Sequence, residues 1–179
     1  MPGRICVFCG AAAGGRPEYA LVARSLGAAL ARRGVAVVYG GASVGLMGAV
    51  ADGALAAGGE VVGVIPQALV EREIAHPGLT TLHVVGSMHE RKALMAELSA
   101  GFVALPGGVG TLEELFEVFT WRQLGLHDKP MALLDVAGYW AGLVSLLEHA
   151  EAEGFLRPGH RRCLWLEDDI DALLDRLVG

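Results

Sequence analysis

This chain of 179 residues has few of the features that mark nucleic-acid-binding, membrane-spanning or redox-active proteins. Positive charge is scarce: the formal net charge is −6 and the pI is near 5.5, so we exclude nucleic acid and anionic membranes as main partners. No apolar run is long enough to span a bilayer without interruption, so no membrane partner is expected. Cysteines are few, and the Cys6-x-x-Cys9 pair begins inside a strand-like run rather than at a helix start. We therefore expect reduced thiols in a cytoplasmic protein.

The signatures of several catalytic mechanisms are also missing. The six histidines show no metal-ligand spacing, so we predict no metal site and expect most of them at the surface. A glycine-rich stretch carries Thr111 where a P-loop needs lysine, which argues against ATP-driven phosphoryl transfer. No cofactor is predicted.

Apolar residues and glycine dominate the composition. Hydrophobic residues make up 53% of the chain and glycines number 26, which indicates an aliphatic core and many tight turns. Seven short apolar segments are typical of buried strands: 5–8, 35–39, 61–65, 82–85, 102–105, 131–134 and 163–166. Helical segments alternate with them. We therefore predict one domain over residues 1–179 of the α/β class, a Rossmann-like doubly wound parallel sheet of about seven strands with helices on both faces.

The expected helix boundaries carry recognisable signals. Pro17 suits the first turn of a helix that stops at Gly34, and Asp168 or Asp169 caps a last helix that reaches Leu177. Ligands of doubly wound sheets lie beyond the carboxyl ends of the strands. We therefore expect the loops after the first, second, fourth and fifth strands to share one pocket. The other helices are expected up to 58, over 87–99, after 111 and over 139–153, with a short helix and a loop in 67–79.

One stretch combines the elements of an anion-binding site. A buried strand over 102–105 leads into the glycine-rich turn 106–110, and a helix follows. Backbone N–H groups and the positive end of the helix dipole face an anion at such a junction, and glycine lets the main chain approach it closely. Thr111-x-x-Glu114 also fits a capping box that serves only stability. Three glycines and a proline in front of it favour a phosphate-binding turn, and a second glycine-rich strand-to-helix turn covers 40–48.

The helix that begins at Ser87 carries the second candidate feature. Ser87-x-x-Glu90 is another capping box, and Arg91 lies on the same helical side as Met88 and Met95. An arginine in an apolar stripe is seldom buried without an anionic partner. We expect Arg91 to hold a phosphate or carboxylate. A purely structural ion pair, or a side chain that reaches out to water, remains the alternative.

The charged residues near the glycine-rich turn and near Arg91 are expected to point in different directions, some into the pocket and some into solvent. Lys92 lies off the apolar stripe. We expect it to be either a second phosphate contact or a solvated residue. Glu114 lies off the apolar face of its own helix and can therefore reach into the pocket. Glu113 and Glu117 are expected to point into solvent.

The chain resembles the LOG (Lonely Guy) proteins, which are cytokinin riboside 5′-monophosphate phosphoribohydrolases. Five segments carry the resemblance: SMHERK (87–92), PGGVGTLEE (106–114), FTWRQLG (119–125), GGASVGLMG (40–48) and HDKP (127–130). The first two are highly specific when they occur together. The resemblance covers nearly the whole chain.

The resemblance implies an enzyme that hydrolyses the N-glycosidic bond of adenosine 5′-monophosphates, plain or N6-substituted, to free base and ribose 5-phosphate. It implies Arg91 and Glu114 as the catalytic pair, and a homodimer with the site near the subunit interface. Gly108, Gly110 and Thr111 would bind the 5′-phosphate. The full set of expected substrate-binding residues is Gly41, Ser43, Glu73, Met88, Lys92, Gly107, Gly108, Val109, Gly110, Thr111, Glu113 and Thr120.

Some positions depart from the family pattern. Ala11 and Ala12 stand where serines are usual and Ala100 where an aspartate is usual, which bears on affinity and base preference. Members have often been labelled lysine decarboxylases, but neither Lys92 nor Lys129 sits in a recognisable pyridoxal phosphate site, so we reject that label. A non-catalytic nucleotide- or cofactor-binding carrier with the same fold is the alternative function. Both functions predict AMP binding, and only the enzyme releases adenine.

Overall fold

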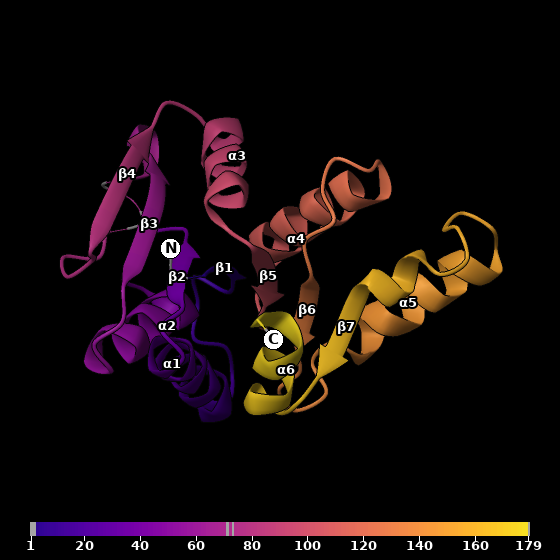
Figure 1. Ribbon diagram of the computed structural model, residues 1–179, viewed down its shortest axis with the longest axis horizontal. Helices are drawn as coiled ribbons and strands as arrows, with labels where there is room; N and C mark the ends of the chain where they lie inside the picture. The colour runs from indigo at the N-terminus through magenta and orange to yellow at the C-terminus, as the bar shows by residue number, and fades with distance from the viewer. Residues whose placement is uncertain (1–2, 71, 73, 179) are drawn as a thin grey trace.

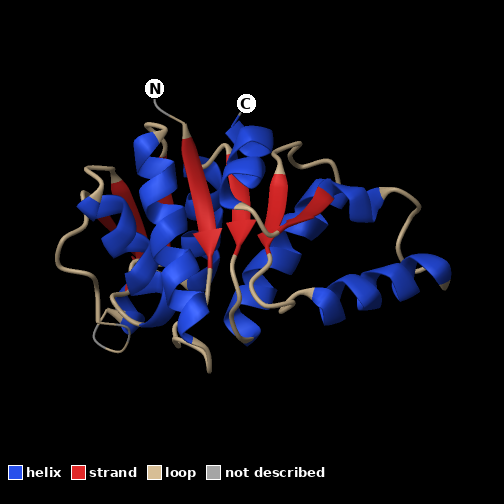
Figure 2. Cartoon of the chain, turned by 90° about the horizontal axis from the view of Figure 1, so that it is seen from below, coloured by secondary structure: helices blue, strands red, loops and turns tan. Residues whose placement is uncertain are grey.

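The computed structural model describes residues 3–70, 72 and 74–178. Its centre is a parallel sheet in which the strands follow the order β4-β3-β2-β1-β5-β6-β7. Figure 2 shows their arrowheads pointing the same way. The expected Rossmann-like sheet is confirmed. Its strands are β1 (Arg4–Phe8), β2 (Ala36–Tyr39), β3 (Val61–Pro66), β4 (Thr81–Val85), β5 (Gly101–Ala104), β6 (Met131–Leu134) and β7 (Leu164–Glu167).

Helices cover both faces of this sheet because its strands are apolar on both sides. Val7 and Val37 belong to one core cluster with α1, α2 and α6, whereas Phe8 and Val38 belong to the other with α3, α4 and α5. Figure 1 shows α1 and α2 together on one side of the sheet and α3 and α4 on the other. The helices are α1 (Pro17–Arg32), α2 (Gly45–Ala56), α3 (Met88–Leu98), α4 (Val109–Gln123), α5 (Ala141–Ala152) and α6 (Ile170–Val178), with 3₁₀ turns η1 (Gln67–Leu69) and η2 (His160–Cys163).

Strand β1 lies between the two halves of the sheet, and the order in which strands are added reverses there. This strand pairs with β2 on one side and with β5 on the other, so successive strands are added outwards in both directions. The loops that leave β1, β2 and β5 therefore diverge at one edge and leave a crevice between them. Both termini lie at the opposite end of the strands in Figure 2.

Two helix starts test the expected capping boxes. Ser87 caps α3 as expected: its Oγ accepts a hydrogen bond from the Glu90 N–H at 3.1 Å, while the Glu90 carboxylate accepts from Gly86 N–H at 2.7 Å. The capping box considered at Thr111 as the alternative to a phosphate-binding turn does not form, because α4 already begins at Val109 with Gly108 in the cap position. The cap residue of α4 therefore offers no side-chain acceptor to the first amide groups of the helix.

The remaining differences concern the later part of the chain. Helix α5 begins at Ala141, two residues after the expected start, and projects from the body in both Figure 1 and Figure 2.

The cap of the last helix is confirmed: Asp169 caps α6, its Oδ1 accepting from Ala172 N–H at 2.8 Å. Within the described ranges, no helix has the length and apolar character needed to cross a membrane.

Candidate active site

A cavity of about 580 Å³ lies at the carboxyl edge of the sheet, where β1 and β5 meet. The loops after β1, β2 and β5 and the start of α3 contribute to it, as expected, and so does the segment after β6, which was not expected. Its lining consists of Val7, Cys9, Gly10, Ala11, Ala12, Ala13, Gly14, Tyr19, Gly40, Leu46, Met47, Met88, Arg91, Pro106, Gly107, Gly108, Gly110, Thr111, Glu113, Glu114 and Tyr139.

The glycine turn between β5 and α4 forms one wall of this cavity. Its carbonyl groups are held from outside the turn: Gly10 N–H donates to Pro106 O at 3.1 Å, and the Tyr139 hydroxyl donates to Gly107 O. A Cβ atom at Gly107 would lie 2.0 Å from Thr111 Oγ1 and 2.8 Å from Gly10 N, so only glycine fits there. The uncapped start of α4 therefore lies beside the cavity in a packed turn, which is the arrangement that binds phosphate groups.

Arg91 enters the site from the first turn of α3. Its side chain is buried, with 4% of the residue exposed. The Nε atom donates to Val64 O at 3.0 Å and the Nη2 atom donates to Gly40 O at 2.8 Å. A Cβ atom at Gly40 would lie 2.1 Å from that Nη2 atom, so this glycine makes room for the guanidinium group. The main chain at the ends of β2 and β3 thus fixes the plane of a buried cation at the cavity.

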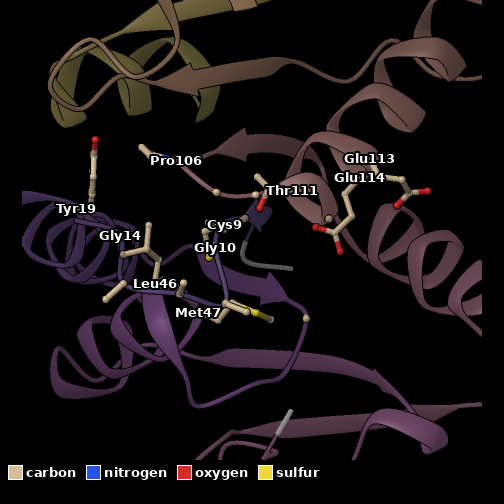
Figure 3. A pocket seen from close by; sticks show the side chains of 18 of the residues that line it. Cys9, Gly10, Gly14, Tyr19, Leu46, Met47, Pro106, Thr111, Glu113 and Glu114 are labelled. Atoms are coloured by element: carbon tan, nitrogen blue, oxygen red, sulfur yellow. The ribbon is translucent and has the colours of Figure 1, made fainter. Parts of the chain in front are cut away.

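Glu114 reaches the same cavity from α4. Figure 3 shows its carboxylate on the side of Thr111 and Cys9, whereas the neighbouring Glu113 extends in another direction. Burial, and then the negative charge of Glu114, raise the pKa of the Cys9 thiol well above its ordinary value, and both also raise that of Cys6. The Glu114 carboxylate therefore acts on the end of β1, and the two free thiols stay protonated at neutral pH.

Lys92 is turned away from Arg91 and lies between two carboxylates of α4. Its Nζ atom donates a hydrogen bond to Glu113 and forms an ion pair of 3.0 Å with Glu117. Burial opposes the charged form, but both carboxylates favour it, and the pKa of Lys92 is raised. The solvated alternative for Lys92 and the solvent-facing position expected for Glu117 are wrong, because both side chains are largely buried in an ion cluster that ties α3 to α4. Glu113 belongs to the same cluster but is exposed, as expected.

The other expected substrate-binding residues are placed as follows. Met88, Gly107, Gly108, Gly110, Thr111 and Glu113 line the cavity together with Arg91 and Glu114. Lys92, Val109, Thr120, Gly41 and Ser43 are not among the lining residues; Val109 is 84% exposed, and Ser43 Oγ donates to Ile74 O at 2.8 Å. Glu73 lies outside the described residues. The substrate contacts of all these residues stay predictions.

Sequence reasoning missed part of the cavity wall. Tyr19 and Tyr139 come from segments read only as helix starts, and Leu46 and Met47 from the glycine-rich turn 40–48, of which only Gly41 and Ser43 were expected to bind substrate. No pattern in the sequence indicates that these side chains converge. The general rule on strand ends predicts the contribution of the first loop, 10–14, but not which of its residues face the cavity.

Two of the histidines, most of which were expected at the surface, are partly buried and hydrogen-bonded. His127 Nε2 lies 2.8 Å from Val118 O, and its Nδ1 accepts from Lys129 N–H at 3.2 Å. His76 Nε2 lies 3.1 Å from an Asp52 carboxylate oxygen. Across residues 3–70, 72 and 74–178, His, Cys, Asp and Glu side chains form no group of three that could hold a metal ion.

Comparison with solved structures extends the fold assignment. The chain aligns with the molybdenum cofactor carrier protein of Chlamydomonas reinhardtii at 23% identity and a TM-score of 0.76, over 99% of both chains. A molybdenum cofactor binding protein of Rippkaea orientalis gives 20% identity and a TM-score of 0.74, over 100% of this chain and 99% of that one. At such identities the likeness establishes the fold alone.

Sequence relatives are much closer. Residues 47–177 match a family model described as "Possible lysine decarboxylase". A cytokinin riboside 5′-monophosphate phosphoribohydrolase of Rhodococcoides fascians is 52% identical over 97% of this chain and 88% of its own length. A relative with the same name from Arabidopsis thaliana is 49% identical over 90% of this chain and 76% of its own length. A relative from Oryza sativa subsp. japonica, named as a probable enzyme of this kind, is 51% identical over 90% of this chain and 73% of its own length. The chain therefore belongs to the LOG family, that of the cytokinin riboside 5′-monophosphate phosphoribohydrolases.

Proposed function

We propose that this protein hydrolyses the N-glycosidic bond of adenosine 5′-monophosphates, plain or N6-substituted, and releases the free base and ribose 5-phosphate. The observation that carries the proposal is one cavity lined by three features: the Arg91 guanidinium, the Glu114 carboxylate and the uncapped start of α4. The relatives named above carry this activity in their names. A cation, an anion and a phosphate-binding turn are what such a reaction requires.

The 5′-phosphate is assigned to the glycine turn. Gly108 and Gly110 have no protein atom within 4 Å of the position that a Cβ would take, so the main chain there is open to a ligand. Backbone N–H groups of the first turn of α4 and the positive end of its dipole favour a dianion. Binding the phosphate there places the ribose next to Glu114, one turn further along the helix.

Glu114 is assigned to the reacting carbon. Cleavage breaks the C1′–N9 bond, the electron pair leaves with the base, and ribose passes through a state that resembles an oxocarbenium ion. A nearby carboxylate stabilises this positive charge and orients the water whose oxygen bonds to C1′. The proton lost by that water balances the charge on the departing base.

Arg91 is assigned two effects that act together. Its fixed positive charge stabilises negative charge that develops on the leaving base, and it favours the ionised form of Glu114. The carbonyl groups of Gly40 and Val64 hold the guanidinium in place before substrate arrives, so no reorganisation is needed during the reaction. Met88, one turn earlier on α3, would contact the base.

Lysine decarboxylation is not proposed, although the family model bears that description. The chain contains two lysines. Lys92 is paired with Glu113 and Glu117, and Lys129 Nζ donates to Ala96 O at 2.7 Å. Neither lysine is among the residues that line the cavity, so neither amine is placed to form a Schiff base with a substrate there.

We also propose that the active form is a homodimer with the site near the interface, and that it works in the cytoplasm, where its free thiols stay reduced. Exposed apolar side chains beside the cavity support the first point: Val109 is 84% exposed and Met88 40%. Analytical ultracentrifugation tests it, and a monomer at the concentrations used for catalysis would contradict it.

The function is tested by chromatography of the products formed from a panel of 5′-monophosphates, with adenosine as the control that lacks the phosphate. We expect adenine and ribose 5-phosphate in equal amounts from AMP, and the corresponding base from N6-isopentenyl-AMP. Adenosine should be cleaved at least about 100-fold less efficiently, because it lacks the group that anchors the ribose. A protein that binds AMP but releases neither product would instead be the carrier considered above.

A further inference from the structure

The segment after β6 brings a tyrosine across to the glycine turn of the neighbouring strand. Ala137 and Gly138 both have positive φ angles, 55° and 73°, and the chain turns sharply there. Asp135 Oδ1 accepts a hydrogen bond from Trp140 N–H at 3.0 Å, and Trp140 Nε1 donates to Leu134 O at 3.2 Å. Trp140 is buried, so the whole turn is anchored in the core. A non-glycine residue in the left-handed region persists only where its surroundings fix it, which suggests that this turn has a function.

Tyr139 is the residue that this turn presents. Its hydroxyl donates a hydrogen bond to Gly107 O, 32 positions away in the sequence. Its ring lies edge-on to Trp140, with centroids 5.0 Å apart, and edge-on to Tyr19, at 6.1 Å. Aromatic contacts on two sides hold the ring, so the position of the hydroxyl is set independently of any ligand.

The hydrogen bond from Tyr139 to Gly107 O fixes the orientation of the whole Gly107–Gly108 peptide unit. In a trans peptide the C=O and the following N–H point in opposite directions, so fixing Gly107 C=O also fixes Gly108 N–H. Neither glycine has a side chain that would restrict rotation of this peptide unit. The preceding carbonyl, Pro106 O, is held in the same way by Gly10 N–H at 3.1 Å. Two donors from outside the turn thus set the direction of its dipoles.

We propose that Tyr139 is a positioning residue for the phosphate site: through Gly107 O it holds the Gly107–Gly108 peptide with its N–H directed at the 5′-phosphate. This inference rests on the proposed function, since it assumes that the turn binds the phosphate of a nucleotide. Tyr139 itself touches no reacting atom. Its effect therefore falls on binding of the phosphate and not on breakage of the C1′–N9 bond.

Tyr139→Phe is the direct test, because it keeps the ring and its packing and removes only the hydroxyl. We expect the KM for AMP to rise about 10-fold while kcat stays within about twofold, since the phosphate contact is the same in ground and transition states. Tyr39→Phe is the matched control: it removes another hydroxyl-to-carbonyl bond, Tyr39 to Ala42 O at 3.0 Å, outside the cavity lining. Its KM should stay within about twofold of wild type.

A binding measurement separates this inference from the proposed function. In the Glu114→Gln background, calorimetry with AMP and with adenosine compares ligands with and without the phosphate. We expect Tyr139→Phe to weaken AMP binding about 10-fold and to leave adenosine binding unchanged. Equal losses for both ligands, or no loss for AMP, would overturn the role of Tyr139. This comparison measures binding and not hydrolysis. It therefore tests the role of Tyr139 even if the wild-type protein binds AMP without hydrolysing it, a result that would contradict the proposed function alone.

Discussion

The Nη2 atom of Arg91 donates a hydrogen bond to the main-chain oxygen of Gly40 at 2.8 Å, across 51 positions of sequence. Together with the bond from Nε to Val64 O, it uses two edges of one planar guanidinium group. The cation of the candidate site is therefore oriented by the ends of two neighbouring strands, β2 and β3. This arrangement explains why a buried charge can be fixed at the cavity before a ligand is bound.

Arg91→Lys should lose both activity and stability. An ammonium group cannot donate along both directions of the guanidinium plane, so at least one of the carbonyls of Gly40 and Val64 loses its partner. We expect kcat/KM to fall about 100-fold and the free energy of unfolding to fall by about 1–3 kcal/mol. Steady-state kinetics and urea unfolding measure the two effects. Arg157→Lys, at an exposed position, is the control, and an active Arg91→Lys enzyme would refute the assignment of Arg91.

The two adjacent glycines of the turn should respond differently to alanine. At Gly107 a Cβ would lie 2.0 Å from Thr111 Oγ1, so Gly107→Ala should lower the free energy of unfolding by about 1–3 kcal/mol. At Gly108 nothing lies within 4 Å, so Gly108→Ala should change stability by less than about 0.5 kcal/mol. Its methyl group would enter the space assigned to the phosphate and weaken AMP binding. Calorimetry and urea unfolding of both variants check this pair, and unchanged AMP affinity in Gly108→Ala would speak against a phosphate in this turn.

The ion cluster around Lys92 predicts a pH effect on the alkaline side. The pKa of Lys92 is raised above its ordinary value of 10.5, so its stabilising contribution is fully present below that pH and is lost as the pH rises through the folded-state value. Lys92→Met leaves Glu113 and Glu117 without their shared partner and should cost about 1–2 kcal/mol near neutral pH. The variant should lose less further stability than wild type above about pH 10. Urea unfolding of both proteins across this pH range measures the difference. Parallel plots of unfolding free energy against pH would show that the charge of Lys92 does not contribute to stability.

His127 predicts a pH effect on the acid side. Burial lowers its pKa below the ordinary 6.5, although the bond to Val118 O acts in the other direction. The folded state therefore prefers neutral His127, so the contribution of this residue is present above pH 6.5 and is lost as the pH falls towards the folded-state value. Protonation also removes the Nδ1 acceptor used by Lys129 N–H.

The variant His127→Leu should therefore be less stable than wild type near about pH 8 and lose less further stability between about pH 7 and pH 5. Exposed His149 gives the matched control, His149→Leu, which should follow the wild-type curve. Thermal unfolding at several pH values measures this. A His127→Leu curve with the wild-type slope would show that this histidine does not titrate with folding.

The fold follows from the sequence because buried strands and amphipathic helices leave local patterns. The continuous apolar runs in β1 and β2 and the proline at the start of α1 are examples. Arg91 could be identified in the same way, since an arginine in an apolar helical stripe is a local anomaly. The glycine turn before α4 could also be identified, from its strand, its glycines and the helix that follows. The residue at which α4 begins could not, because Thr111 and Glu114 also fit a later cap.

Other parts of the site depend on contacts between distant segments. Lys92 reaches Glu113 and Glu117 only because α3 and α4 pack on the same face of the sheet, and no spacing within either helix indicates the pairing. Tyr139 meets Gly107 only because β6 lies next to β5. Such relationships arise from strand order and from the direction of loops, which hydrophobic periodicity does not specify.

The proposed role of Glu114 in breaking the glycosidic bond is tested by one comparison. Adenine release and AMP affinity are measured on the same preparations of wild type, Glu114→Gln and the exposed control Glu97→Gln. We predict that Glu114→Gln keeps AMP affinity within about threefold and lowers adenine release by at least about 1,000-fold, because the carboxylate acts on the transition state. Glu97→Gln should match wild type in both measurements. If Glu114→Gln binds AMP and releases adenine within about tenfold of the wild-type rate, Glu114 is not the catalytic carboxylate.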